Sequence, residues 1–189
     1  MSPPRVELRS VHLDDARALA TLYTAERSFL APFEPTRDEA FYSTAGQRRI
    51  LERTIGLRVA GFSDRFLILA DEALVGVLTV NNIVRGVFQS GSIGYFVAQA
   101  HNRRGIATQA VARVCEWAFG ASGLHRLEAG TLIDNLASQR VLEHNGFTRI
   151  GVAPRYLLIA GRWQDHVLFQ RLAEESSLAG YSTNFETVS

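Results

Sequence analysis

The positions of hydrophobic residues repeat with two periods, which divide the chain into expected strands and helices. Apolar and charged residues alternate over residues 5–9, as in a half-buried strand. Apolar residues three and four positions apart predict helices that begin near residues 14, 44, 105 and 134. Apolar runs bounded by turn residues predict further strands at residues 66–70, 74–80, 92–98, 125–132, from 147 onward, 156–159 and 167–169.

The order of these elements describes one α/β (α+β) domain with a mixed sheet. Asp71-Glu72 is long enough only for a hairpin turn, and Ala160-Gly161-Arg162 is expected to close another hairpin. Residues 81–91 are expected to form a longer turn. From about Glu174 the pattern dissolves into Ser, Thr and Gly. We therefore expect a single domain over residues 1–173 and a flexible tail over residues 174–189.

Composition narrows the function classes. The formal net charge is only +1, so direct binding to nucleic acid is not expected. All 20 basic residues are Arg, which excludes Schiff-base chemistry and a P-loop lysine. The single cysteine, Cys115, lies on the apolar side of a predicted helix and is expected to be buried. The N-terminus lacks a signal-peptide pattern and no stretch resembles a membrane span, so we expect a cytoplasmic protein without membrane contact.

The segment His101–Thr108 joins a predicted strand to a predicted helix and is a candidate phosphate-binding loop. The first N–H groups of a helix have no partner within the helix, and the peptide dipoles add partial positive charge there. Arg103 and Arg104 add further charge, and Gly105 allows the backbone to approach a ligand closely. Taken alone, the segment is equally well explained as a solvated strand-to-helix loop.

The segment Phe29–Glu39 contains two prolines and is expected to be irregular. Its apolar residues stand among acids, and they either line a site for an amine-bearing substrate or fix the loop to the core.

Two motifs carry a family resemblance. Gly105 and Ala107 stand at the small-residue positions of a Gln/Arg-x-x-Gly-x-Gly/Ala loop, although Asn102 replaces its Gln or Arg. Residues 135–138 have the form Asn-x-x-Ser and begin a helix that closes on Gly146-Phe147. Together they resemble the GNAT acyl-CoA N-acyltransferases. The segments at 29–39, 84–86, 94–95, 125–126 and 156–168 are similar to the branch of that family that acetylates N-termini of ribosomal proteins, and the likeness covers about residues 6–172.

The resemblance implies the GNAT fold, a mixed and mostly antiparallel sheet of about seven strands flanked by helices, with strands four and five splayed apart. Acetyl-CoA would be the co-substrate, and no metal would take part. The backbone of Tyr95 to Ala98 would meet the pantetheine arm, and N–H groups near Val97 would suit oxyanion stabilisation. The residues that would hold the cofactor are Phe96, Val97, Ala98, Asn102, Arg103, Arg104, Gly105, Ile106, Ala107, Thr108, Asn135 and Ser138.

The resemblance also suggests catalytic and substrate-binding residues. Ser138 falls on the family serine that meets the departing sulfur, which makes it a candidate general acid, and Asn135 lies one helical turn earlier on the same face. From the residues alone, Ser138 is as well explained by a side-chain bond to the backbone of the first helical turn. The acceptor would contact Phe33, Glu34, Tyr95 and Tyr156.

The identity of the general base is left open. An α-amino group has a pKa near 7.7–8.0, so a weak base or a water relay would suffice. The candidates, each of which also has a structural explanation, are Glu34, Glu128, Tyr156 and Asp165. No pair among the five histidines has metal-ligand spacing, and solvated or structural roles are expected for all of them.

The sequence thus predicts an acetyl-CoA-dependent N-acetyltransferase that transfers acetyl directly to an amine. The expected acceptor is the N-terminal alanine of a protein, with ribosomal proteins as candidates. One alternative is a small amine such as an antibiotic or polyamine, because a polyamine favours a closed acidic pocket and a protein N-terminus needs an open groove. The other is a non-catalytic acyl-CoA-binding module. Whether the chain is a monomer or a dimer is left open.

Overall fold

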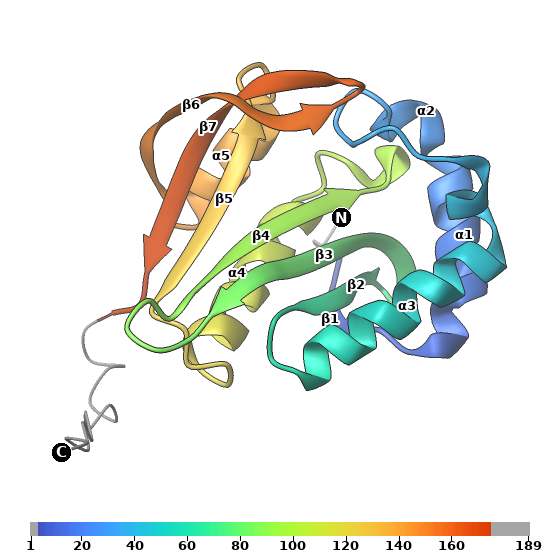
Figure 1. The fold of residues 1–189 in the computed structure, drawn as a ribbon, viewed down its shortest axis with the longest axis horizontal. Coiled ribbons are helices and arrows are strands. Elements are labelled where there is room, and N and C mark those ends of the chain that lie inside the picture. The colour runs from blue at the N-terminus through green and yellow to red at the C-terminus, as the bar shows by residue number, and fades with distance from the viewer. Residues whose placement is uncertain (1–3, 175–189) are drawn as a thin grey trace, which may run out of the picture.

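The computed structural model describes residues 4–174, so the predicted tail lies outside the described part except for its first residue, Glu174. The strands and helices form one layered unit (Figure 1). In chain order they are β1 (Val6–Ser10), a short 3-10 turn at Leu13–Asp15, α1 (Ala16–Ala25), α2 (Arg27–Leu30), a 3-10 turn at Glu39–Tyr42, α3 (Thr44–Val59), β2 (Asp64–Ala70), β3 (Ala73–Val84), β4 (Ser90–Val97), a 3-10 turn at Gln99–His101, α4 (Ile106–Phe119), β5 (Arg126–Leu132), α5 (Leu136–His144), β6 (Thr148–Ile159) and β7 (Arg162–Leu172).

The seven strands form one sheet in the order β1-β2-β3-β4-β5-β7-β6. Every neighbouring pair is antiparallel except β4 and β5, which are parallel at the centre of the sheet. The parallel pair requires a crossover connection, and α4 supplies it between the two strands. The prediction of a mixed, mostly antiparallel sheet with flanking helices is therefore confirmed.

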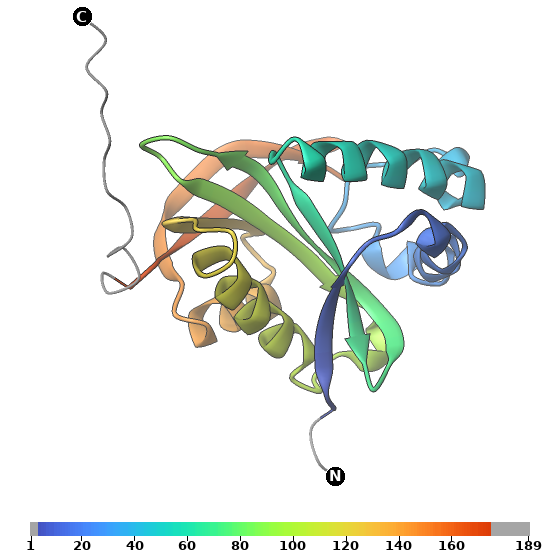
Figure 2. The same cartoon turned by 90° about the horizontal axis from the view of Figure 1, so that it is seen from below.

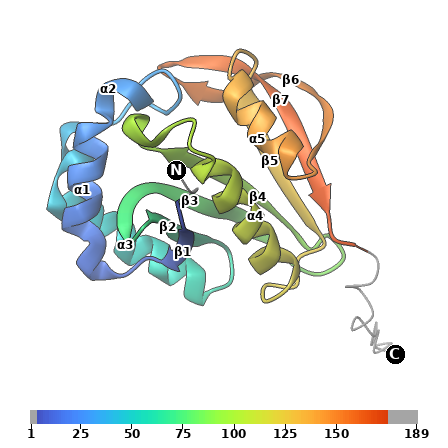
Figure 3. The same ribbon diagram turned by 180° about the vertical axis from the view of Figure 1, so that it is seen from behind.

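Helices cover both faces of the sheet (Figures 2 and 3). Alternate residues of a strand point to opposite faces, so each strand contributes to two separate cores. On the face covered by α4 and α5, here the α4 face, Leu78 and Ile93 pack with Val114. On the face covered by α1 and α3, here the α3 face, Leu67 and Val77 pack with Leu19 and Leu51. Both cores include residues of β4, whereas β5 contributes Leu127 and Ala129 to the core on the α4 face.

The predicted turn at residues 81–91 was too long. The strand β3 continues to Val84 and β4 begins at Ser90, so the turn is confined to residues 85–89. The pairing of β3 with β4 shifts register between Asn81 and Val84, and Asn82 has a φ of 52°. An irregularity of this kind breaks the two-residue period, and for this reason the pattern does not show the end of the strand.

Two other expectations concern single features. Cys115 is buried on α4, as predicted, and burial raises the pKa of its thiol to about 11. At that pKa the thiol is protonated near neutral pH and is a poor nucleophile. Within residues 4–174 no helix is long and apolar enough to cross a membrane.

Candidate active site

The parallel strands β4 and β5 separate before β4 ends. They pair from Ser90 opposite Arg126 to Ile93 opposite Ala129, and the described residues show no pairing of β4 with β5 beyond that point. The Ala98 N–H donates to Val75 O, on the β3 side of the strand. Because backbone groups alternate between the two edges of a strand, those of Tyr95 and Val97 face the gap toward β5. The gap therefore exposes a strand edge that can bind an extended ligand through its backbone, and the side chains of Val97 and Ala98 lie in the core.

Ser138 lies at this gap and is held by two hydrogen bonds on the α4 face. Its Oγ is 2.9 Å from the Oη of Tyr95, and its backbone N–H donates to Oδ1 of Asn135 at 3.1 Å. Asn135 is the N-cap of α5, so the local bond in the first helical turn is made by Asn135 rather than by the Ser138 hydroxyl. Burial raises the pKa of Tyr95 to about 12, while the bond to Ser138 opposes this shift. The phenol therefore stays protonated at neutral pH and can donate to Ser138.

The loop between β4 and α4 has the conformation of an anion-binding helix N-terminus. Gly105 caps α4 with a φ of 73°, and Arg103 before it has a φ of 59°. A Cβ added to Gly105 would meet no atom within 4 Å, which leaves the first N–H groups of α4 open to a ligand. Arg104 Nη1 lies 3.3 Å from Nδ1 of His101, and the side chain of Ile106 is buried in the core. Within this loop, backbone groups, the arginines and the exposed side chain of Asn102 are thus available for ligand contacts.

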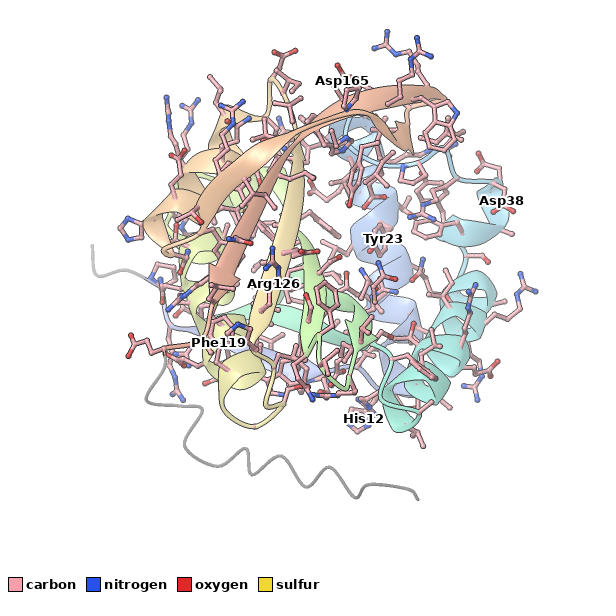
Figure 4. All side chains as sticks on the ribbon, turned by 60° about the vertical axis from the view of Figure 1, so that its left-hand side comes forward. His12, Tyr23, Asp38, Phe119, Arg126 and Asp165 are labelled. Carbon is pink, nitrogen blue, oxygen red and sulfur yellow. The ribbon has the colours of Figure 1, made fainter. Side chains whose placement is uncertain are left out.

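A cavity of about 960 Å³ lies mainly on the α3 face and extends through the gap to Asn135 and Ser138. Phe33, Glu34, Tyr95 and Phe96 line it, so it joins residues from the predicted acceptor and cofactor sites. Tyr156 is not among the lining residues. Its ring centre lies 5.5 Å from the ring centre of His166, and His166 does line the cavity. Figure 4 shows Tyr23 on α1, from where it also reaches the cavity, and Asp38 at the outer surface.

The four candidate bases have different environments. Glu128 accepts a hydrogen bond from Arg126 at 2.9 Å, and Asp165 accepts one from the N–H of Arg155 at 2.8 Å. Neither Glu128 nor Asp165 lines the cavity, whereas Glu34 does. Burial raises the pKa of the Glu34 carboxyl, and the charges of Arg37 and Arg65 act against this shift.

His166 lines the cavity and was not predicted as a functional residue. It is 3% exposed, and its Nδ1 lies 2.9 Å from the carbonyl oxygen of Gln164. A carbonyl oxygen can only accept, so Nδ1 carries the proton, and in the neutral ring Nε2 is then an acceptor. The apolar residues Val167 and Phe169 are buried on the α4 face. Because successive residues of a strand point to opposite faces, the apolar residues 167 and 169 indicate that His166 points to the α3 face, where most of the cavity lies.

Comparisons with known proteins agree with this geometry. Residues 5–148 match the model of the acetyltransferase (GNAT) domain. The [ribosomal protein uS5]-alanine N-acetyltransferase of Escherichia coli K12 is 34% identical over 170 residues, which cover 89% of this chain and 88% of that protein. The probable N-acetyltransferase YjcK of Bacillus subtilis is 34% identical over 171 residues, which cover 85% of this chain and 90% of that protein.

Solved structures give the same result. Mycobacterium smegmatis RimJ in complex with CoA-disulfide has a TM-score of 0.87 at 34% identity, with 92% of this chain and 88% of that chain covered. The ribosomal-protein-S5-alanine acetyltransferase from Vibrio fischeri has a TM-score of 0.87 at 29% identity, with 93% and 97% covered. With its central sheet opened between β4 and β5 and a glycine-capped helix following β4, this chain belongs to the GNAT family of N-acetyltransferases.

Proposed function

We propose that the protein transfers acetyl from acetyl-CoA to the N-terminal amine of a protein that begins with alanine, with ribosomal proteins as the first candidates. The observation that carries the proposal is the charge of the cavity. Its charged lining comprises one carboxylate, Glu34, against Arg37, Arg53 and Arg65. A polyamine would meet repulsion there, whereas a peptide end has one amine and many backbone groups that accept hydrogen bonds. The 34% identity to a uS5-alanine N-acetyltransferase supports the same acceptor class.

The open edge of β4 and the glycine-capped loop fit the two parts of acetyl-CoA. The backbone of Tyr95 and Val97 would bind the pantetheine arm, and the first turn of α4 with Arg103 and Arg104 would bind the pyrophosphate. Acetyl-CoA supplies an acetyl group activated as a thioester. The N–H groups near Val97 would stabilise negative charge that develops on the acetyl oxygen.

Two side chains on opposite faces would handle protons. Nε2 of His166 would accept the proton of the acceptor amine, because Nδ1 is committed to Gln164 and the ring lines the cavity. On the other face the hydroxyl of Ser138 would pass a proton from the phenol of Tyr95 to the departing thiolate, and water would return a proton to Tyr95 after the thiol leaves. Both groups belong to the chain itself, and no covalent enzyme intermediate is required.

The test is acetylation of synthetic peptides, followed by thiol release and by intact mass. A peptide that begins with Ala should gain one acetyl group, while the same peptide with a blocked N-terminus and an internal Lys should gain none. Spermidine serves as the small-amine comparison. Efficient acetylation of spermidine, or of the Lys side chain in the blocked peptide, with no reaction of the free N-terminus would refute the proposal.

A further inference from the structure

The guanidinium of Arg65 is a buried positive charge on the wall of the acceptor cavity. Arg65 lies in β2, is 7% exposed and lines the cavity. Its backbone is fixed on both sides, because Val11 N–H donates to its carbonyl oxygen and it pairs with Thr79 of β3. The position of this side chain is thus set by the sheet and not by a flexible loop.

The polar partners of Arg65 leave some hydrogen-bond donors of its guanidinium unpaired. Its Nη2 donates to the Oη of Tyr23 at 2.8 Å, and its Nε is buried with no hydrogen-bond partner. Among residues 4–174 no carboxylate forms a salt bridge with it. A buried cation with a single neutral partner is costly, and such groups are usually paired with an anion. The guanidinium of Arg65 therefore has hydrogen-bonding capacity that no described residue uses.

The charges of the cavity are mostly positive. Among the described residues Glu34 is the one carboxylate in the lining; its closest cation is Arg37, with 3.9 Å between Oε2 and Nε, and the charge of Arg65 acts on it as well. Arg53 adds a further positive charge to the wall. A carboxylate that entered the cavity would thus meet an excess of positive charge, and the planar fork of Arg65 suits a carboxylate through two parallel hydrogen bonds.

The sheet register gives the distance from Arg65 to the gap where acetyl transfer would occur. Arg65 lies opposite Thr79, and Thr79 lies opposite Gly94 at the point where β4 leaves β5. Two steps of about 4.8 Å between strands place the Cα of Arg65 roughly 10 Å from that of Gly94. An extended peptide covers this distance in about three residues.

We propose that Arg65 selects acceptors with an Asp or Glu side chain within the first four residues of the N-terminus to be acetylated. The carboxylate would bind the guanidinium on its cavity side while the amine lies at the gap. This inference rests on the proposed function and adds an acidic residue to the acceptor. If Arg65 instead donates to a peptide carbonyl oxygen, every acceptor satisfies it equally and no such selection exists.

The experiment needs first only the unaltered protein. Peptides of one length begin with Ala and carry Glu at the second, third or fourth position, and each has a partner with Gln at that position. The kcat/KM of at least one Glu peptide should exceed that of its Gln partner by roughly tenfold or more, the usual effect of a charge-assisted hydrogen bond. Equal values for all three pairs overturn the inference, while acetylation of the Gln peptides leaves the proposed function standing. If no peptide reacts, the proposed function fails and this inference falls with it.

Variants then identify the residue. Arg65→Gln should remove the preference for Glu, so that each Glu peptide reacts no faster than its Gln partner. Arg65→Lys should restore part of the preference, because it keeps the charge but not the fork. Arg49→Gln, on the exposed side of α3, is the matched control and should retain the full preference. If a folded Arg65→Gln variant still prefers Glu peptides to Gln peptides, the inference is overturned. If that variant does not fold, the comparison of Glu and Gln peptides with the unaltered protein decides between the outcomes.

Discussion

Two groups of residues beside the gap between β4 and β5, one around Ser138 and one around Arg65, differ in how completely their polar groups are satisfied. On the α4 face, Tyr95, Ser138 and Asn135 form a connected set of hydrogen bonds. On the α3 face, the Nε of Arg65 has no partner, and Glu34 has only a long ion pair with Arg37. A group that already has its partner is positioned in advance, whereas an unpaired buried group favours a ligand that completes it.

The difference indicates that the two faces serve two kinds of ligand. The α4 face would bind the same cofactor in every reaction cycle, so a site built from backbone groups and a fixed Tyr–Ser pair suffices. The α3 face would distinguish between acceptors, and a buried polar group that a wrong acceptor leaves unpaired is an effective way to reject it. The predictions below test this division, from the largest expected effect to the smallest.

Gly105→Glu should abolish acetyl-CoA binding and leave the fold intact. The new side chain meets no atom of the protein, but it places negative charge at the N-terminus of α4 and strains a φ of 73°. We expect affinity to fall roughly 100-fold or more in calorimetric titration. Gly86→Glu is the control, because Gly86 has a φ of 71° and equally open surroundings in the β3–β4 turn. Unchanged affinity in a folded Gly105→Glu variant would exclude this loop from the cofactor site.

His166→Gln should lower kcat by roughly 100- to 1,000-fold without affecting acetyl-CoA affinity, as expected for loss of a general base. The deficit should shrink above about pH 9, where an acceptor amine with a pKa near 8 is already neutral. A purely structural role would give a deficit that does not depend on pH. His144→Gln, at the exposed end of α5, should behave like the unaltered protein.

Ser138→Ala should lower kcat by about 10- to 100-fold and leave acetyl-CoA affinity nearly unchanged, because the hydroxyl acts on the departing thiolate. The measurement is steady-state kinetics combined with calorimetric titration. Ser28→Ala, on the exposed side of α2, is the comparison. An unaltered kcat would remove Ser138 from the mechanism and reduce the α4 face to a binding surface.

Tyr95→Phe should change how stability depends on alkaline pH. In the folded protein burial raises the pKa of Tyr95 to about 12 from 10.0, so the folded state holds this proton more tightly than the unfolded state. The stabilisation is fully present below about pH 10 and is lost as pH rises toward 12. Urea unfolding at pH 8 and pH 11 should show a smaller loss of stability in Tyr95→Phe than in the unaltered protein. Equal losses in the two proteins would mean that Tyr95 is not buried against Ser138.

Interactions between residues close in sequence were predictable, and those that join distant segments were not. The pair Asn135 and Ser138 is visible as a motif because one helical turn joins the two residues. Gly105 is visible because a strand followed by a glycine and a helix has few possible geometries. By contrast, Tyr23 and Arg65 are 42 residues apart and meet only because α1 packs on the face of β2 to which Arg65 points.

The amino-acid pattern by itself determined the mixed sheet and the family motifs, and it marked residues 101–108 as a candidate phosphate-binding loop, since these features depend on local backbone conformation and on two short periods. Only the tertiary structure decided that Glu34 and not Asp165 lines the cavity, that His166 lines the same cavity, and that the Nε of Arg65 is buried without a partner. Whether a charge is paired, buried or open to a ligand depends on which strands and helices enclose it. That enclosure is set by packing between segments far apart in the chain, on which the local pattern carries no information.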